Sequence, residues 1–436
     1  MTKKSLLLFF TVLLAIAAGP TFAQDAPAYP AATDASVFVF NTTLFLISGM
    51  VVMFMAAGFC MLEVGLVRAK NAATICVKNI ALFSIAGIMV WLLGYNLIYG
   101  VAEGGFIGKF GIWGADDADW AQTGYAASSD WYFQMVFVAT AASIVSGTVA
   151  ERVKLWPFLI FVAALTGVIY PIQASWEWGG GWLDAKFAFA DFAGSTLVHS
   201  TGGWAALAGA LVIGARDGKY DQTGRVHAMP GSSLPLATLG TFILWLGWFG
   251  FNGGSQLALG SIDNAIAVAK IFVNTNMAAA AGVVTALVLT QLLYKKVDLT
   301  ITLNGAIGGL VSITASPLEP SIGLAVLIGS IGGVIVTLAV PLLDKLKIDD
   351  VVGAIPAHLF CGIWGTLVVP LSDKSASLIG QLVGVVSIGV FVFTISFALW
   401  YLLKLTTGVR ASEPDEQIGL DKAELGMEAY PEFSPA

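Results

Sequence analysis

The chain has 436 residues, of which 57% are hydrophobic and only 11% are charged. A soluble domain carries about 25% charged residues, so this chain cannot cover its surface with polar groups and must lie largely in lipid. The net charge of −7 comes with no basic patch large enough for nucleic acid, which argues against a nucleic-acid partner.

The first 23 residues are typical of a secretory signal peptide. Lys3 and Lys4 give a basic start, residues 6–18 form a short apolar core, and residues 21–23 offer a small-residue cleavage site. We expect this segment, 1–23, to be removed, which leaves residues 24–36 as a short exported N-terminal segment.

Eleven apolar segments follow, most of them near the length that a membrane helix needs. Such runs predict an all-α membrane protein rather than a barrel, whose strands would alternate apolar and polar residues. The 49 glycines are typical of closely packed membrane helices. The predicted spans lie near residues 37–66, 79–101, 131–149, 155–174, 192–214, 233–258, 265–293, 299–315, 321–343, 352–371 and 377–403.

Basic residues concentrate in every second loop, and this bias predicts the orientation of the chain. With the mature N-terminus outside, the outside loops hold only Lys109, Lys186 and Lys374. The inside loops hold many more, Lys78 among them. An odd number of spans then places the C-terminal tail, residues 404–436, in the cytoplasm.

Two of the three histidines lie in apolar segments, where an ionisable side chain is costly and therefore points to a function. Asp191 precedes His199 by eight residues, and Asp350 precedes His358 by the same interval. A glycine follows each histidine by four residues. The repeated spacing predicts that the two segments are equivalent elements of an internal repeat.

These two segments are the fifth and the tenth of the eleven. Because five is odd, the second half must be inverted relative to the first, as in transporters with their site at the repeat interface. We therefore predict a transmembrane domain over 37–403. It would consist of a 5+5 inverted repeat, with halves at about 37–214 and 233–371, and a last helix at 377–403.

Two histidines at similar depth could meet and handle a proton. A neutral imidazole can donate from one nitrogen and accept at the other, so two in contact can share one proton. Protonation of both is strongly disfavoured in a low dielectric. The pair suits ammonium, which is expensive to desolvate as a cation but not as neutral ammonia, and whose proton a histidine chain can pass on.

Three other interpretations of the histidines stay open. A zinc site would need a third ligand, and neither aspartate supplies it, because eight helical residues span about 12 Å. The pair could serve as a proton path for another substrate, or pack by hydrogen bonds to neighbouring helices. No metal or cofactor is expected, and the cysteines, Cys60, Cys76 and Cys361, are expected to be small buried residues.

Six stretches spread along the chain resemble a known family. They are FVATAASIVSGTVAERVK at 137–154, WGGGWL at 178–183, DFAGSTLVHSTGG at 191–203, WFGFNGGS at 248–255, DDVVGAIPAHLFCGIWG at 349–365 and GLDKAELGMEAYPEF at 419–433. From about residue 37 to 433 the sequence is similar to the ammonium transporter family (Amt/Mep/Rh), closest to its bacterial Amt branch.

The resemblance implies roles for aromatic residues at an outer vestibule. Trp178, Phe137 and Ser255 match the site that recruits ammonium, where a cation over ring faces gains about 0.5–2 kcal/mol. Phe137 and Phe251 match the stacked phenylalanines that close the pore below.

The resemblance also assigns the polar residues of the repeat. His199 and His358 match the paired histidines of the pore. Asp191 matches an acid near the recruitment site, and we interpret it as a structural acid that caps a helix start. Asp350 is its counterpart in the second half.

The sequence thus predicts a transporter that recruits NH4+, deprotonates it, and conducts NH3 with a relayed proton. Ammonium, ammonia and methylammonium are the expected substrates. An ammonium sensor acting through a PII-type protein and a passive ammonia channel are the alternatives. An enzyme is not expected, since no nucleophile elbow, phosphate loop or H-E-x-x-H occurs.

The resemblance further implies a homotrimer in the cell (inner) membrane and a possible PII-type signalling protein at the cytoplasmic face. The tail departs from the family pattern, because Leu425-Gly426-Met427 stands where many members have His-Gly-Glu.

Overall fold

The computed structural model describes residues 32–431. The predicted signal peptide and most of the predicted exported segment lie outside these residues. Within them the chain is helical, with two isolated β-bridges and no named strand. The longer helices are α2 (Asp34–Leu66), α3 (Ala72–Met89), α6 (Ala127–Thr148), α7 (Leu155–Ala164), α10 (Thr201–Ile213), α11 (Leu234–Gly254), α12 (Ile262–Tyr294), α13 (Leu299–Ile313), α14 (Ile322–Lys345) and α16 (Leu378–Thr406).

Shorter helical pieces complete or connect these helices. Several are π-helical turns, which are rare and occur often at functional sites. The pieces are η1 (Ala69–Asn71), η2 (Val90–Gly94), α4 (Tyr95–Tyr99), α5 (Trp120–Thr123), η3 (Leu165–Ile169), α8 (Tyr170–Ser175), α9 (Trp182–Phe187), η4 (Ser195–Ser200), η5 (Ile355–Phe360), α15 (Cys361–Leu367), η6 (Val369–Leu371), α17 (Glu413–Ile418) and η7 (Asp421–Leu425).

Side-chain caps explain where many of the helices begin. A hydroxyl or carboxylate at the residue before the helix accepts a hydrogen bond from a backbone N–H that has no partner in the first turn. Ser233 caps α11, Ser261 caps α12 and Asp298 caps α13 in this way. Ser321 and Ser377 do the same for α14 and α16.

Eight described helical segments are long and apolar enough to cross a membrane by length and composition. The segments from Leu299–Ile313 and Ile355–Leu371 are apolar but shorter, and α6 is not among the eight. Large apolar side chains such as Ile80, Phe242 and Ile379 are exposed on the outside of the bundle, as expected for a surface in contact with lipid.

The second membrane segment begins earlier than the sequence predicted. We expected it to start near residue 79, with Lys78 in an inside loop, but the helical segment runs from Ala69 to Tyr99 and Lys78 is buried within it. The amine of Lys78 donates to the backbone carbonyl of Ser146 at 2.9 Å and lies 4.7 Å from the centroid of the Phe158 ring. Burial of a charged amine is costly, and these two contacts stabilise Lys78 in its buried position.

The cysteines also differ from expectation. Cys361 is buried, but Cys76 is exposed and Cys60 is half-buried, with their sulfurs 3.7 Å apart. They line a groove between α2 and α3.

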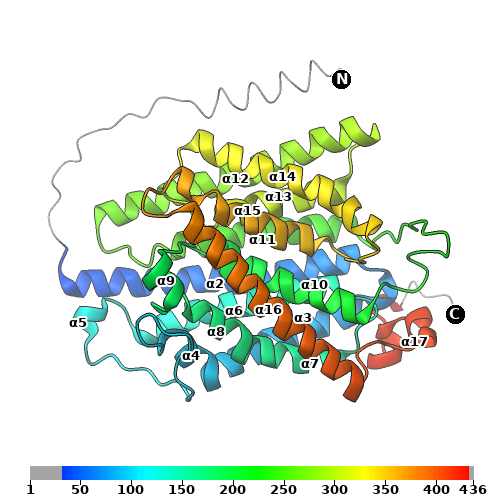
Figure 1. The fold of residues 1–436 in the computed structure, drawn as a ribbon, viewed down its shortest axis with the longest axis horizontal. Helices are drawn as coiled ribbons and strands as arrows, with labels where there is room; N and C mark the ends of the chain where they lie inside the picture. The colour runs from blue at the N-terminus through cyan, green and yellow to red at the C-terminus, as the bar shows by residue number, and fades with distance from the viewer. Residues whose placement is uncertain (1–31, 432–436) are drawn as a thin grey trace.

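The helices are arranged so that their connecting segments gather at two opposite ends (Figure 1). At one end the tail packs on the loops that carry most basic residues. Lys70 Nζ donates to the carbonyls of Glu416 and Gln417, and the Asp421 carboxylate accepts from the backbone N–H groups of Ala73 and Thr74. The tail therefore docks on the loops of its own chain.

A charged network lies at this same end. Arg216 donates to Asp349 at 2.8 and 2.9 Å and to Glu151 at 3.0 Å, and all three side chains are buried. Burial alone would raise the pKa of Asp349, but hydrogen bonds from Arg216 and the charges of Arg152 and Arg216 outweigh it and hold that pKa well below its usual range. The network connects the loops after α6, α10 and α14.

Candidate functional site

The two histidine segments cross at unusually short range, and the glycines after the histidines make this possible. A Cβ at Gly203 would lie 2.6 Å from the Cβ of Leu359, and one at Gly362 would lie 2.3 Å from the carbonyl oxygen of Ser195. Any larger residue would push the segments apart. Each glycine is thus the contact point for the other segment, and the crossing brings the two π-helical turns η4 and η5 together.

His199 and His358 meet at this crossing. Their Nδ1 atoms are 3.2 Å apart, and the rings are stacked with centroids at 5.3 Å. Both side chains are buried, at 0% and 3% exposure. Two facing Nδ1 atoms at this distance form a hydrogen bond when one of them carries a proton. The Nε2 atom of His199 is buried and has no hydrogen-bond partner among the described residues.

Asp191 holds the start of η4. Its Oδ1 accepts from the N–H groups of Gly194 and Ser195 at 3.1 and 2.7 Å, and its Oδ2 accepts from those of Thr196 and Leu197 at 2.7 and 2.8 Å. These are the backbone donors that a helix start leaves without partners. The carboxylate does not reach His199 by any hydrogen bond in the described residues, so its direct effect is on the backbone.

Asp350 accepts fewer hydrogen bonds from the start of η5 than Asp191 does from the start of η4. One oxygen accepts from the N–H of Ile355 at 2.7 Å and the other from the hydroxyl of Thr148 at 3.0 Å. It also lines a cavity at the end of the molecule where the tail docks. The two aspartates therefore occupy equivalent positions but have different surroundings.

Aromatic rings cover His199 on the side away from the tail. Trp248 stacks on His199 with centroids 4.9 Å apart, and Phe251 lies next to both. Phe251 in turn stacks on Phe137 at 4.0 Å. Two stacked phenylalanines and a tryptophan thus surround this side of His199 with apolar rings, which a hydrated ion cannot pass without losing its water.

Beyond Phe137 lies a cavity of about 390 Å³, here named the outer cavity because the charge bias of the loops predicts that this end faces outside. Trp178, Phe137 and Ser255, the three residues predicted to recruit ammonium, all line it. The Trp178 ring lies at right angles to Phe137 with centroids 6.1 Å apart, and its Nε1 donates to the carbonyl of Asp191. The Ser255 hydroxyl donates to the carbonyl of Phe251 at 2.8 Å, which leaves its oxygen able to accept.

The same cavity contains residues that the sequence analysis did not assign to it. Asp130 lines it together with three tyrosines, and its carboxylate accepts hydrogen bonds from the hydroxyl of Tyr95 and from Gln134. A buried carboxylate beside ring faces favours a cation. The signal was present in the sequence, because Asp130, Gln134 and Phe137 are spaced by four and three residues and so share one helix face.

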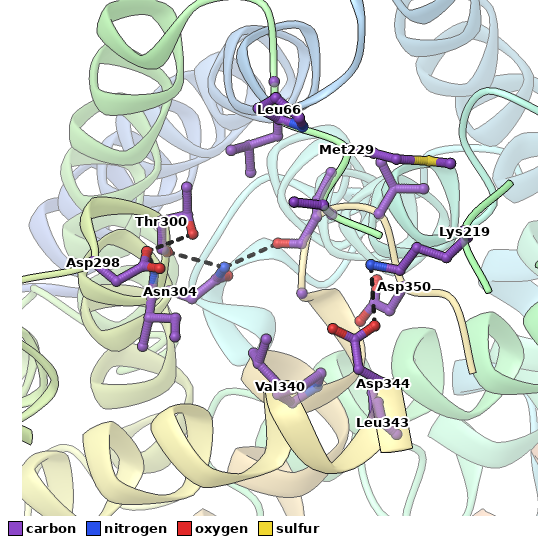
Figure 2. Close-up of a pocket in the computed structure, with 18 of the residues that line it drawn as sticks. Leu66, Lys219, Met229, Asp298, Thr300, Asn304, Val340, Leu343, Asp344 and Asp350 are labelled. Carbon is purple, nitrogen blue, oxygen red and sulfur yellow. Dashed lines mark hydrogen bonds and ion pairs between the residues drawn. The ribbon is translucent and has the colours of Figure 1, made fainter. Parts of the chain in front are cut away.

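A second cavity of about 380 Å³ lies at the opposite end and is named the inner cavity, because that end is predicted to face the cytoplasm. Figure 2 shows Lys219 paired with Asp344, and Asp298 hydrogen-bonded to Thr300, with Asn304 of α13 reaching the loop before η5. Asp350 and Pro356 also line this cavity, so it lies next to the start of η5. The histidine pair therefore lies between the two cavities, and the stacked rings of Phe137 and Phe251 separate it from the outer one.

Among residues 32–431, no group of three or more His, Cys, Asp or Glu side chains is arranged to hold a metal ion. The histidine pair itself contacts aromatic rings, and no third His, Cys, Asp or Glu side chain of the described residues joins it as a metal ligand.

A family model described as the Ammonium Transporter Family matches residues 43–430. The chain is 42% identical over 419 residues to ammonium transporter Amt2 of Archaeoglobus fulgidus, covering 89% of this chain and 87% of the relative. It is 41% identical over 396 residues to a putative ammonium transporter of Synechocystis, with 89% of each chain covered.

Solved structures with the same fold include a sensor Amt protein and Candida albicans Mep2. The sensor Amt protein has a TM-score of 0.83 and 33% identity, covering 90% of this chain and 99% of its own. Mep2 has a TM-score of 0.80 and 27% identity, covering 92% of this chain and 94% of its own.

Proposed function

This chain belongs to the ammonium transporter family, and from that premise we propose that it recruits NH4+ at the outer cavity and removes its proton at the histidine pair. Ammonia then crosses the apolar passage, and the histidines relay the proton, so that net transport carries charge. The chain is a multi-pass ammonium transporter; the deprotonation step is the proposal.

One observation carries the proposal, namely that His199 and His358 are in contact between two cavities. A buried polar atom without a partner costs about 1–3 kcal/mol, so the free Nε2 of His199 is a costly feature unless a solute uses it. Ammonia can donate to this nitrogen as it passes. The shared proton between the Nδ1 atoms then gives the pair a route to move charge without admitting a hydrated ion.

Recruitment takes place at Trp178, Phe137 and Ser255. A cation between the two rings gains from their faces, while the Ser255 oxygen accepts one of its N–H groups. Phe137 and Phe251 then act as the gate, because their stacked rings admit neutral ammonia more readily than a charged species. Asp191 and Asp350 are structural acids that hold the two histidine segments.

The domain organisation follows from the same reasoning. We assign residues 37–403 to a transmembrane domain of eleven helices. The similar spacing, π-helical turns and crossing glycines of the two histidine segments support an inverted repeat of residues 37–214 and 233–371. The end with the tail and the basic loops is cytoplasmic, and residues 1–23 are a signal peptide removed at the cell membrane.

Assembly as a homotrimer and regulation by a PII-type protein also belong to this proposal. The described part of the tail contacts the loops after α2 and α6 through Glu416 and Glu424, where a docked protein could alter it. Gly426, which has a φ of +66°, ends the last helical turn of the tail, η7.

A sensor is the second candidate function. The likeness to the sensor Amt protein, at a TM-score of 0.83, supports it. Sensing and transport use the same outer cavity, and they differ in whether ammonium passes the phenylalanine gate.

Methylammonium uptake in cells that lack their own ammonium transporter tests the proposal. Cells that express the chain are expected to accumulate labelled methylammonium, and ammonium is expected to compete with it. The control is the Phe251→Trp variant, whose larger ring obstructs the gate. Binding of ammonium to the purified protein without uptake would favour the sensor and contradict transport.

A further inference from the structure

A buried acid lies on the tail side of the histidine pair and has no part in the steps described above. Glu63 is in the last turn of α2 and is 1% exposed. Its Oε2 accepts from the Ser146 hydroxyl at 2.7 Å and its Oε1 lies 3.4 Å from the amide nitrogen of Asn79. An ionisable group inside a membrane segment is expensive, so its presence calls for a function.

Lys78 is the nearest buried cation, but it does not neutralise Glu63 by direct contact in the described structure. Its amine donates to the carbonyl of Ser146, whose hydroxyl donates to Glu63. One serine therefore joins the two charged groups. This leaves the carboxylate oxygens of Glu63 with neutral donors only.

Glu63 and His358 line the same small cavity of about 10 Å³. That volume is close to the smallest that holds one water molecule. Among the described residues that line it, Glu63 and His358 are the ones with an ionisable side chain. The other side chains include Phe59, Ile307 and Ser143.

The small cavity also borders the inner cavity. Asn304 and Val352 line both, and the Asn304 amide donates to the Val352 carbonyl at 2.9 Å. Figure 2 shows Asn304 on the wall of the inner cavity. The small cavity that Glu63 and His358 share therefore adjoins the inner cavity at Asn304 and Val352.

We propose that Glu63 is the inner proton acceptor of the transport cycle and takes the proton that His358 releases. This inference rests on the proposed proton relay. An N–H bond of the His358 imidazolium breaks, a water molecule in the small cavity gains that proton, and the same water gives one of its own protons to the Glu63 carboxylate. His358 ends neutral, Glu63 ends as a neutral acid, and the water is unchanged. Glu63 then releases its proton to the inner cavity.

The rival explanation is that Glu63 only compensates the charge of Lys78. Two variants separate the explanations. Glu63→Gln keeps the size and an acceptor oxygen but removes the titratable group, and it leaves Lys78 uncompensated. The double variant Glu63→Gln with Lys78→Met removes both charges, and replacement of a buried charge pair by neutral groups is usually tolerated by the fold.

The test is the current driven by an ammonium gradient in proteoliposomes, with ammonia flux measured beside it by internal pH. Both variants are expected to lose at least about tenfold in current, as for other proton-transfer groups, while ammonia flux persists. Cys60→Ser, three residues earlier on α2, is the control and is expected to keep the wild-type current. Glu63→Asp, which retains a carboxylate, is expected to keep part of it.

A wild-type current in Glu63→Gln would overturn the role of Glu63 and leave the histidine relay standing. Recovery of the current in the double variant would also overturn it, since charge compensation would then suffice. If Glu63→Gln fails to assemble, the double variant alone decides by the same criterion. Absence of an ammonium-dependent current in the wild-type protein would overturn both the relay and the role of Glu63.

Discussion

The two histidine segments have the same sequence spacing but different surroundings. In the first, Asp191 satisfies four backbone N–H groups at the start of η4, and His199 lies under Trp248 and Phe251. In the second, Asp350 holds one N–H group and the Thr148 hydroxyl, and it lines the inner cavity.

This difference suggests how the proposed inverted repeat gains a direction. The shared features are the π-helical turns and the crossing glycines, and they bring the histidines together at 3.2 Å. The differing features face opposite ends. The first segment meets the aromatic rings next to the outer cavity, and the second borders the inner cavity at the end where the tail docks.

The largest difference in stability loss between the two histidine segments is expected when their aspartates are replaced. Asp191→Ala leaves four buried N–H groups without partners, and each costs about 1–3 kcal/mol, so the total loss is expected to exceed about 4 kcal/mol. Asp350→Ala frees one N–H group and is expected to cost about 1–3 kcal/mol. Thermal unfolding in detergent measures both, and equal losses would contradict the difference between the copies.

A smaller loss than that of Asp191→Ala is expected from Asp349→Asn, which breaks the charged network beside the second copy. Removal of one partner from a buried ion pair costs about 3–5 kcal/mol. Asp349→Asn should therefore lower the unfolding temperature markedly, while Asp373→Asn on an exposed loop should not. An unchanged unfolding temperature would show that the network adds nothing to stability.

The charged network also predicts how the stability of the protein depends on pH. The folded-state pKa of Asp349 is depressed, so its stabilisation is complete above the unfolded pKa of about 3.9 and is lost as the pH falls through the folded value. Between pH 6 and 8 the Asp349 carboxylate therefore stays ionised. A change of transport rate in that range must then come from other groups, and measured rates of Asp349→Asn should follow the wild-type pH profile.

Replacing both histidines by acids tests whether the pair excludes ions. In the variant His199→Asp with His358→Glu the passage carries negative charge, so potassium is expected to enter. The ammonium-to-potassium current ratio should fall by at least about tenfold, which corresponds to about 1.4 kcal/mol. An unchanged ratio would mean that selectivity is set before the histidines, at the outer cavity.

The smallest effect is expected at the outer cavity itself. Trp178→Leu removes one ring face from the recruitment site, and the loss of a cation–π contact of about 0.5–2 kcal/mol corresponds to a rise in KM of about 2- to 30-fold. The maximal rate should change less. A fall in the maximal rate with an unchanged KM would place Trp178 in the gate rather than in recruitment.

Most of the fold could be predicted because lipid imposes long apolar runs. Each of the eleven predicted segments contains helix, and helix boundaries often fell within a few residues. Lys78 broke the pattern, since hydropathy treats any lysine as a loop signal, whereas a carbonyl and a ring in the fold stabilise this one. Local sequence could not show that Ser146 lies beside Lys78.

The site was predictable in part for a related reason. Few polar residues occur in the apolar segments, so His199 and His358 stood out, and symmetry suggested that they meet. Glu63 and Asp130 did not stand out, because each lies near the end of a segment, where an acid is ordinary. Their burial depends on helices distant in sequence, and only the assembled structure brings Glu63 to the cavity of His358.

The central claim is that the histidine pair strips and relays a proton while ammonia crosses. The most direct test is the electrical current of the purified protein reconstituted in a sealed membrane under an ammonium gradient. We predict an ammonium-dependent inward current whose size follows ammonia flux. Ammonia flux without any such current would contradict the relay and leave a passive ammonia channel.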